Sequence, residues 1–145
     1  LNTVSASVQQ KIAAYLIELS NLGVAGYRID AAKHIHPVEL DSIVSRVNRA
    51  MVAAGKPRPY WFLEVIDYGG EAVRVIDYFG IGYASGGASD ITEFKARGLA
   101  DKFLGKDGQK VAELATFSQS NWGLMPSSKA RVFVNNHDTQ RGDGI

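Results

Sequence analysis

The sequence predicts an α/β fold built around a parallel β-sheet, and two observations carry this prediction. Segments with apolar residues at helical spacing alternate with short aromatic or β-branched runs. Such an alternation supplies the crossover helices that parallel strands require, right-handed by default. The chain has 145 residues, 46% of them hydrophobic and 21% charged, which is enough for one domain or part of one.

Each expected element has its own local signal. Ser7 and Gln10 have the spacing of a capping box, Pro37 suits the first turn of a helix, and His36 before it suits a surface or N-cap position. In chain order we expect a helix from Ser7 to just before Gly23, a strand over 24–29, a helix from Pro37 to Gly55, a strand over 60–66, a glycine-rich loop over 67–90 with some helix near 71–78, a strand over 90–94, helical pieces over 95–105 and 109–120, and a strand over 130–136.

The charge pattern argues against several classes of partner. Sixteen basic and fifteen acidic residues give a net charge of +1, without a basic stripe, so neither a nucleic acid nor an anionic membrane is expected as partner. No apolar run approaches the ~18 residues of a spanning helix. The absence of cysteine excludes disulfides and thiolate metal sites. The N-terminus has no signal-peptide pattern. Because the sequence starts at Leu1 without a methionine, we expect either that a preceding part was removed or that this is a segment of a longer product.

Three predicted strands end in a carboxylate: Asp30, Glu64 and Asp138. Since the carboxyl ends of parallel strands lie on one side of a sheet, acids far apart in sequence can converge there on one pocket. Each acid also has a structural explanation to weigh. Asp30 suits the N-cap of the next helix, and Asp138 suits a surface turn. Glu64 is harder to explain in this way, because it lies between Leu63 and Val65 in an apolar strand.

The neighbours of the first two acids favour a catalytic interpretation. Arg28 lies two residues before Asp30, on the same side of the strand, where its charge favours an ionised carboxylate. Glu64 lies among aromatic and aliphatic residues that favour a protonated acid. One ionised and one protonated carboxylate is the pair that retaining glycoside hydrolysis uses, and a third carboxylate such as Asp138 can stabilise the positive charge that develops on the sugar.

Five short motifs resemble one family. "GYRIDAAKH", "FLEVI" and "FVNNHD" look like the three carboxylate motifs of the α-amylases, the retaining glycoside hydrolases built on a (β/α)8 barrel. "EVIDYGGEA" and "NWGLMPS" resemble their chloride-activated, animal-type branch. The resemblance implies a partial TIM barrel that contains roughly the fourth to seventh strands, so that residues 1–145 are the central part of a catalytic barrel domain. A complete barrel needs about 250 residues.

The same resemblance implies roles for individual residues. Asp30 would be the nucleophile, Glu64 the acid/base and Asp138 the transition-state stabiliser. The substrate-binding residues would be Arg28, Lys33, His34, Glu71 and His137. The structural alternatives are a solvated cation for Lys33 and a strand-end histidine bonded to backbone for His137.

Two ions are also implied by the resemblance. The backbone carbonyl of His34 would bind calcium, with the other ligands outside this chain, in agreement with calcium's preference for oxygen. Chloride, a probable activator in this branch, would lie between Arg28 and Asn136. The resemblance further implies a secreted, monomeric parent protein that acts on α-glucan polysaccharides.

The expected function is therefore endo-hydrolysis of α-1,4-glucosidic bonds in starch and glycogen, with retention of configuration. Alternatives within enzymes are an α-glucosidase or a transglycosylase of the same family. The alternative from another class is a sugar-binding barrel without catalysis. We expect the 145-residue chain by itself to be inactive and poorly soluble, because four strands of a barrel leave two sheet edges unpaired.

Overall fold

The computed structural model describes residues 1–117 and 119–138. Residues 140–145, where the resemblance implies that a cleft loop would continue, lie outside the described residues. Four strands form one sheet in the order β1-β2-β3-β4. They are β1 (Gly26–Ile29), β2 (Tyr60–Leu63), β3 (Asp90–Thr92) and β4 (Ala130–Arg131). All three neighbouring pairs are parallel. The predicted α/β fold with a parallel sheet is confirmed.

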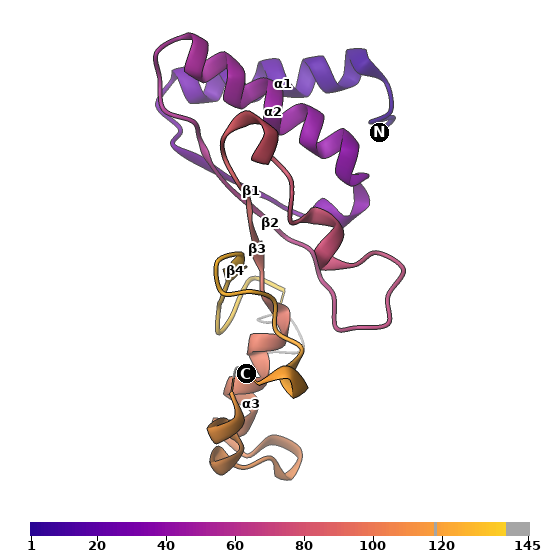
Figure 1. Ribbon diagram of the computed structural model, residues 1–145, viewed down its shortest axis with the longest axis vertical. Coiled ribbons are helices and arrows are strands. Elements are labelled where there is room, and N and C mark those ends of the chain that lie inside the picture. Colours follow the sequence, from indigo (N-terminus) through magenta and orange to yellow (C-terminus); the bar gives the residue numbers. More distant parts are fainter. Residues whose placement is uncertain (118, 139–145) are drawn as a thin grey trace.

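Helices cover the two ends of an elongated molecule (Figure 1). The helices α1 (Ala6–Asn21) and α2 (Pro37–Ala53) pack against each other at one end, and α3 (Gly98–Leu104) lies at the other. Short 3₁₀ helices fill the connections: Ala32–His34, Val75–Tyr78, Tyr83–Ser85, Phe94–Arg97, Lys106–Gly108, Val111–Thr116 and Ser120–Trp122. No helix in the described part of the chain has the length and apolarity that a membrane crossing needs.

The start of α1 differs from the prediction. Its N-cap is Ser5, without a side-chain capping bond, and the predicted capping box of Ser7 and Gln10 is wrong. The helix begins earlier because the Ser5 carbonyl accepts hydrogen bonds from the backbone N–H groups of Val8 and Gln9. The helix end agrees with the prediction: Gly23 follows it with φ 106°, a conformation that favours glycine.

The core lies between α2 and the sheet. His36 is the N-cap of α2 and its ring accepts from the Val38 N–H, which confirms one of the two positions considered for it. The apolar face of α2 is buried as its helical spacing predicts: Leu40, Ile43, Val44, Val47 and Met51. Trp61 of β2 is buried among these residues and donates to the Asn48 side chain at 2.9 Å. Ser45, the other buried polar residue of that helix, bonds to Ser85 at 3.3 Å, so both are paired.

Strand β1 approaches β2 closely at its first residue. A Cβ atom on Gly26 would lie 2.9 Å from the backbone oxygen of Tyr60, so glycine is needed there. The register pairs Gly26 with Tyr60 and Ile29 with Leu63. The two strands therefore end level with each other, which brings the residues after Ile29 and after Leu63 to the same edge.

Strand β4 is shorter than predicted. The expected strand over 130–136 pairs with β3 only at Ala130 and Arg131. The reason lies in its partner, because β3 ends at Thr92 and the next residue, Glu93, caps a 3₁₀ helix by accepting from the Lys95 N–H at 3.0 Å. Beyond Arg131 the segment pairs with no other strand of the described residues, and Val134 is 70% exposed.

Candidate active site

Two of the predicted catalytic acids meet at one guanidinium. Arg28 of β1 forms an ion pair with Asp30 through Nη1, and through Nη2 it lies 2.6 Å from Oε1 of Glu64. The level ends of β1 and β2 make this possible, since they place the two acids at the same edge of the sheet. The structure thus brings Asp30, Glu64 and Arg28 together, although Glu64 lies 36 positions after Arg28 in the sequence.

Glu64 is buried, at 4% exposure, and both of its oxygens are hydrogen-bonded. Besides Arg28, the backbone N–H of Ala31 donates to Oε2 at 2.7 Å. The apolar surroundings predicted for Glu64 are present in Leu63 and Val65, which are both buried, but its carboxylate also has two polar donors. A buried acid with such partners avoids the cost of an unpaired charge.

Asp30 does not cap the following helix. The N-cap of the 3₁₀ helix Ala32–His34 is Ala31, without a side-chain capping bond, while the Asp30 carboxylate pairs with Arg28. Its side chain is 63% exposed. Asp30 is therefore accessible to a ligand, whereas Glu64 lies beneath it.

Lys33 and Glu71 form a second charged pair beside the first. Lys33 Nζ lies 2.8 Å from Glu71 Oε2 and donates to the Ile66 backbone oxygen at 3.1 Å. The ammonium group of Lys33 holds the pKa of Glu71 below its usual value, mainly through this hydrogen bond. Lys33 thus connects the turn after β1 to the loop after β2. Because its ammonium group has these two partners, Lys33 is not the freely solvated cation that was the structural alternative.

The loop that carries Glu71 is shaped by Asp67. The Asp67 carboxylate accepts from the backbone N–H groups of Gly69 at 2.8 Å and Val75 at 2.9 Å. These bonds, that of Val75 above all, lower the pKa of Asp67. Sequence reasoning did not select Asp67, although an aspartate two residues before a glycine is a known turn signal.

Tyr78 fixes the backbone around His34. Its hydroxyl lies 3.2 Å from the Lys33 carbonyl and 3.0 Å from the Ile35 carbonyl, one on each side of His34. Burial raises the pKa of Tyr78, which keeps its proton available for these bonds. His34, Lys33 and Tyr78 also line a hollow of about 540 Å³ with Ala72 and Val73. No sequence pattern indicates this role of Tyr78.

The third acid has local partners. The Asp138 N–H donates to the Asn136 side chain at 3.1 Å, and His137 Nε2 lies 3.4 Å from the Asp138 carboxylate. Both side chains are about half exposed, at 51% and 56%. These contacts join Asp138 to its neighbours rather than to Asp30 or Glu64, so its convergence with those acids stays a prediction.

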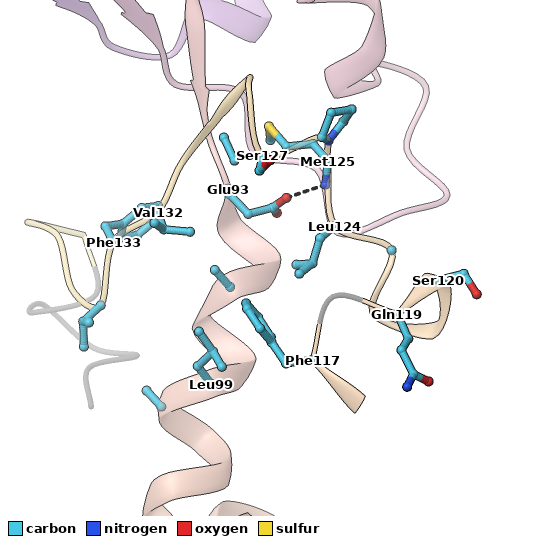
Figure 2. A pocket seen from close by; sticks show the side chains of 16 residues that line it. Glu93, Leu99, Phe117, Gln119, Ser120, Leu124, Met125, Ser127, Val132 and Phe133 are labelled. Atoms are coloured by element: carbon cyan, nitrogen blue, oxygen red, sulfur yellow. Dashed lines mark hydrogen bonds between the residues drawn. The ribbon is translucent and has the colours of Figure 1, made fainter. Parts of the chain in front are cut away.

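A larger pocket lies elsewhere and has different chemistry. Figure 2 shows this hollow of about 860 Å³, lined mainly by apolar side chains such as Leu99, Phe117 and Val132. Its carboxylate, Glu93, is buried and already accepts from the Met125 N–H at 2.7 Å. The pocket contains no second acid and none of the predicted site residues, so it is not the candidate active site.

Comparisons with known proteins point to one group. No family model matches the chain. Pig (Sus scrofa) pancreatic alpha-amylase is 42% identical over 141 residues, which cover 94% of this chain and 26% of that protein. Mouse (Mus musculus) pancreatic alpha-amylase 2a5 is 40% identical over the same shares.

Solved structures agree. Alpha-amylase I of Eisenia fetida superimposes on all of this chain with a TM-score of 0.82 and 34% identity, over 28% of its own length. A mutant of the same enzyme, solved in complex with maltohexaose, matches with the same score.

The parallel sheet with its crossover helices, together with these similarities, defines the class: the chain is an α/β segment that is similar to part of known glycoside hydrolases. More narrowly, it is a homologue of part of the animal-type α-amylases. The chain spans about a quarter of the length of the curated relatives it matches.

Proposed function

We propose that the protein containing this chain is an α-amylase, which hydrolyses internal α-1,4 bonds of starch and glycogen with retention of configuration. The observation that carries the proposal is the contact of one guanidinium, Arg28, with both Asp30 and Glu64. Retaining hydrolysis needs two carboxyl groups close together, one to attack the sugar and one to donate a proton to the leaving oxygen and then take one from water. Asp30 and Glu64 are two such groups, held by the same guanidinium.

In the proposed mechanism each residue acts at a stated atom. The Asp30 carboxylate attacks the anomeric carbon while Glu64 donates a proton to the leaving glycosidic oxygen, which gives a covalent glycosyl-enzyme. Glu64 then removes a proton from water, and that water displaces Asp30. Asp138 would stabilise the positive charge on the sugar, and Arg28 would orient the Asp30 carboxylate for attack through their ion pair.

The proposed substrate contacts extend along the same edge. Lys33, His34 and Glu71 would bind the sugar on the leaving-group side, and His137 would bind the sugar at the cleavage point. The ion pair of Lys33 with Glu71 supports this assignment, because it holds a donor and an acceptor side by side at the rim. Sugar hydroxyls need both kinds of group.

Calcium and chloride belong to this proposal. The residues described here contain no group of three or more metal-binding side chains, so this chain would supply one oxygen, the His34 carbonyl, to a calcium ion that stabilises the fold when bound. The backbone on both sides of that carbonyl is held by Tyr78, which suits such a ligand. Chloride would bind at Arg28, whose five N–H groups are not used up by two ion pairs, and at Asn136.

The finer assignments are also proposals. We infer that residues 1–145 are the central part of the barrel domain, with β1 to β4 as its fourth to seventh strands, and that the protein is secreted and monomeric. The fit of the whole chain onto part of an α-amylase supports the first of these. Alternatives are an α-glucosidase or a transglycosylase of the same family, or a sugar-binding barrel without catalysis.

The proposal is tested in the complete protein that contains this segment. Asp30→Asn and Glu64→Gln should each reduce starch hydrolysis by about 10³-fold or more, while both variants still unfold cooperatively as folded proteins. Substantial activity in either variant would reject these catalytic roles. The products from maltooligosaccharides distinguish the alternatives, since longer transfer products indicate a transglycosylase and release of single glucose units indicates an α-glucosidase.

A further inference from the structure

Tyr68 presents an exposed aromatic ring at the carboxyl edge of the sheet, four residues after Glu64. The residue is 57% exposed. Its ring meets Phe94 edge to face, with centroids 6.1 Å apart, and Phe94 meets Phe133 in the same way at 5.0 Å. Because Phe94 is buried, one edge of the Tyr68 ring is anchored while the remainder faces solvent. This edge-to-face packing fixes the ring without covering it.

The backbone of Tyr68 is held as firmly as its ring. Its N–H lies 3.4 Å from Oε1 of Glu71, whose other oxygen pairs with Lys33. On its other side, Asp67 accepts from the N–H groups of Gly69 and Val75 and closes the loop. Tyr68 is thus an exposed ring on a braced loop, and a ligand that packs on it would lose little conformational entropy from the protein.

The groups beside Tyr68 complete the chemistry of a sugar site. A pyranose has apolar C–H faces, which pack on aromatic rings, and hydroxyl groups, which need donors and acceptors. Tyr68 offers the ring, Lys33 offers N–H donors, and Glu71 offers carboxylate oxygens. Sites for small ligands combine apolar surface with a few fixed polar groups in this way. Tyrosine is well suited because it gives a large contact area with only two side-chain torsions to fix.

We propose that Tyr68 is a specificity-determining residue that packs against a glucose unit beyond the cleaved bond, next to Lys33 and Glu71. This inference rests on the proposed α-amylase function and adds a residue to it. Short substrates should depend on Tyr68 more than starch does, because a long chain has other contacts along the cleft. Transfer to a second sugar should depend on it too, since an acceptor occupies the same side.

The test uses three variants of the complete enzyme. Tyr68→Ala removes the ring, Tyr68→Phe keeps the ring without its hydroxyl, and Tyr83→Ala is the control. Tyr83 is 75% exposed on the 3₁₀ helix Tyr83–Ser85, and Ser85 there bonds to Asn48 of α2, away from Glu64. The readouts are KM and kcat for maltotriose and maltopentaose, the positions of the bonds cleaved in end-labelled maltopentaose, and thermal unfolding.

Tyr68→Ala should raise KM for maltopentaose about two- to tenfold, the range expected for one lost aromatic contact, and should change kcat less than KM. The favoured cleavage position should shift along the oligosaccharide. Tyr68→Phe should restore most of the affinity, and Tyr83→Ala should behave as the unmodified enzyme does.

Unchanged KM and cleavage positions in Tyr68→Ala would overturn the inference, as would an equal change in Tyr83→Ala or no recovery in Tyr68→Phe. If Tyr68→Ala unfolds, maltopentaose binding is measured instead in three inactive proteins. These are Glu64→Gln alone, Glu64→Gln combined with Tyr68→Phe, and Glu64→Gln combined with Tyr68→Leu. Loss of affinity in Tyr68→Leu alone supports the inference, and equal affinity in all three rejects it. An unmodified enzyme that hydrolyses no α-glucan would reject the proposed function itself, which is a different result from an active enzyme indifferent to Tyr68.

Discussion

The backbone N–H of Ala31 donates a hydrogen bond to Glu64 Oε2 at 2.7 Å, although 33 residues of sequence separate the two. Ala31 has a left-handed conformation, with φ 47° and ψ 37°, which is uncommon for a residue with a side chain. The turn after Asp30 therefore directs an N–H group at the acid of the next strand. The position of Glu64 is set by the turn that follows β1 as well as by its own strand.

Substitutions of Ala31 should separate backbone conformation from side-chain contacts. Ala31→Val should destabilise the protein by about 1–2 kcal/mol, because a β-branched residue disfavours positive φ, and should lower kcat as the N–H turns away from Glu64. Ala31→Gly adopts positive φ freely and should keep both stability and activity. Urea unfolding and starch kinetics measure the two effects. Equal behaviour of the two variants would show that the turn geometry does not matter.

Arg28→Lys should show whether one cation must reach both acids. Lysine keeps the charge but has a single ammonium group, so it cannot contact Asp30 and Glu64 in the geometry of a guanidinium. We expect kcat/KM on starch to fall by about 10²-fold, with a smaller loss of stability of about 1–3 kcal/mol. Arg46→Lys on the exposed face of α2 is the matched control. Near-normal activity of Arg28→Lys would mean that charge alone is sufficient.

Much of this arrangement could be predicted from the sequence, and the failures have physical reasons. The alternation of apolar patterns predicts α2, β1 and β2 well, because each buries a regular face or run against the others. The short β4 was not predictable, because its length depends on where β3 ends, and that end is set by the side chain of Glu93. The residue pattern of one strand gives no information on where the neighbouring strand ends.

The same distinction applies to the candidate site. Asp30, Glu64 and Arg28 were found because acids at the ends of apolar strands are a strong signal. Ala31, Asp67 and Tyr78 were not predicted because each acts through backbone groups. The Ala31 N–H donates to Glu64, the Asp67 carboxylate accepts from two backbone N–H groups, and the Tyr78 hydroxyl bonds to two backbone carbonyls. Backbone geometry at a turn has little sequence signature when the residue is an alanine. The placement of Asp138 relative to Asp30 stays a prediction.

The loop that carries Tyr68 and Glu71 should loosen in acid. Asp67 has a pKa below its ordinary 3.8, and Glu71 has one below 4.5, because hydrogen bonds hold both as carboxylates. A carboxyl group whose pKa is lower in the folded protein than in the unfolded chain stabilises the fold at pH values above its unfolded pKa. This stability is lost as the pH falls through the pKa of the folded protein. The order of the loop should therefore decrease below about pH 4.5. Hydrogen exchange at the Val75 and Gly69 amides measures this directly.

Asp67→Asn provides the matched variant. The amide keeps one acceptor oxygen and loses the charge, so one of the two bonds to Gly69 and Val75 should weaken, at a cost of about 0.5–1.5 kcal/mol. The Val75 amide should then exchange about two- to tenfold faster at neutral pH and respond less to acid. Unchanged protection in Asp67→Asn, with the same acid response, would contradict the role given to Asp67.

At the opposite edge of the sheet, a polar cluster should make the protein sensitive to alkali. The Tyr60 hydroxyl, at the start of β2, donates to Asp90 of β3 at 2.6 Å, and Arg131 of β4 contacts both side chains. Burial, followed by the hydrogen bond to Asp90, raises the pKa of Tyr60 above its ordinary 10.0. The folded protein thus holds this proton more tightly than the unfolded chain does. The stability that the Tyr60 hydroxyl contributes is fully present below pH 10. It is lost as the pH rises from 10 through the pKa of Tyr60 in the folded protein.

Tyr60→Phe removes this proton and should therefore flatten the loss of stability above pH 10. At pH 8 it should cost only about 0.5–1 kcal/mol, because Tyr60 is 42% exposed and water screens the cluster. Burial also raises the pKa of Tyr78, so some alkaline sensitivity should remain in the variant. Tyr15→Phe, an exposed site on α1, is the control and should leave the slope unchanged. Urea unfolding at pH 8, 9.5 and 10.5 gives the slopes. If Tyr60→Phe and the unmodified protein lose stability in parallel, the clustered hydroxyl does not link the three strands in the way that its contacts indicate.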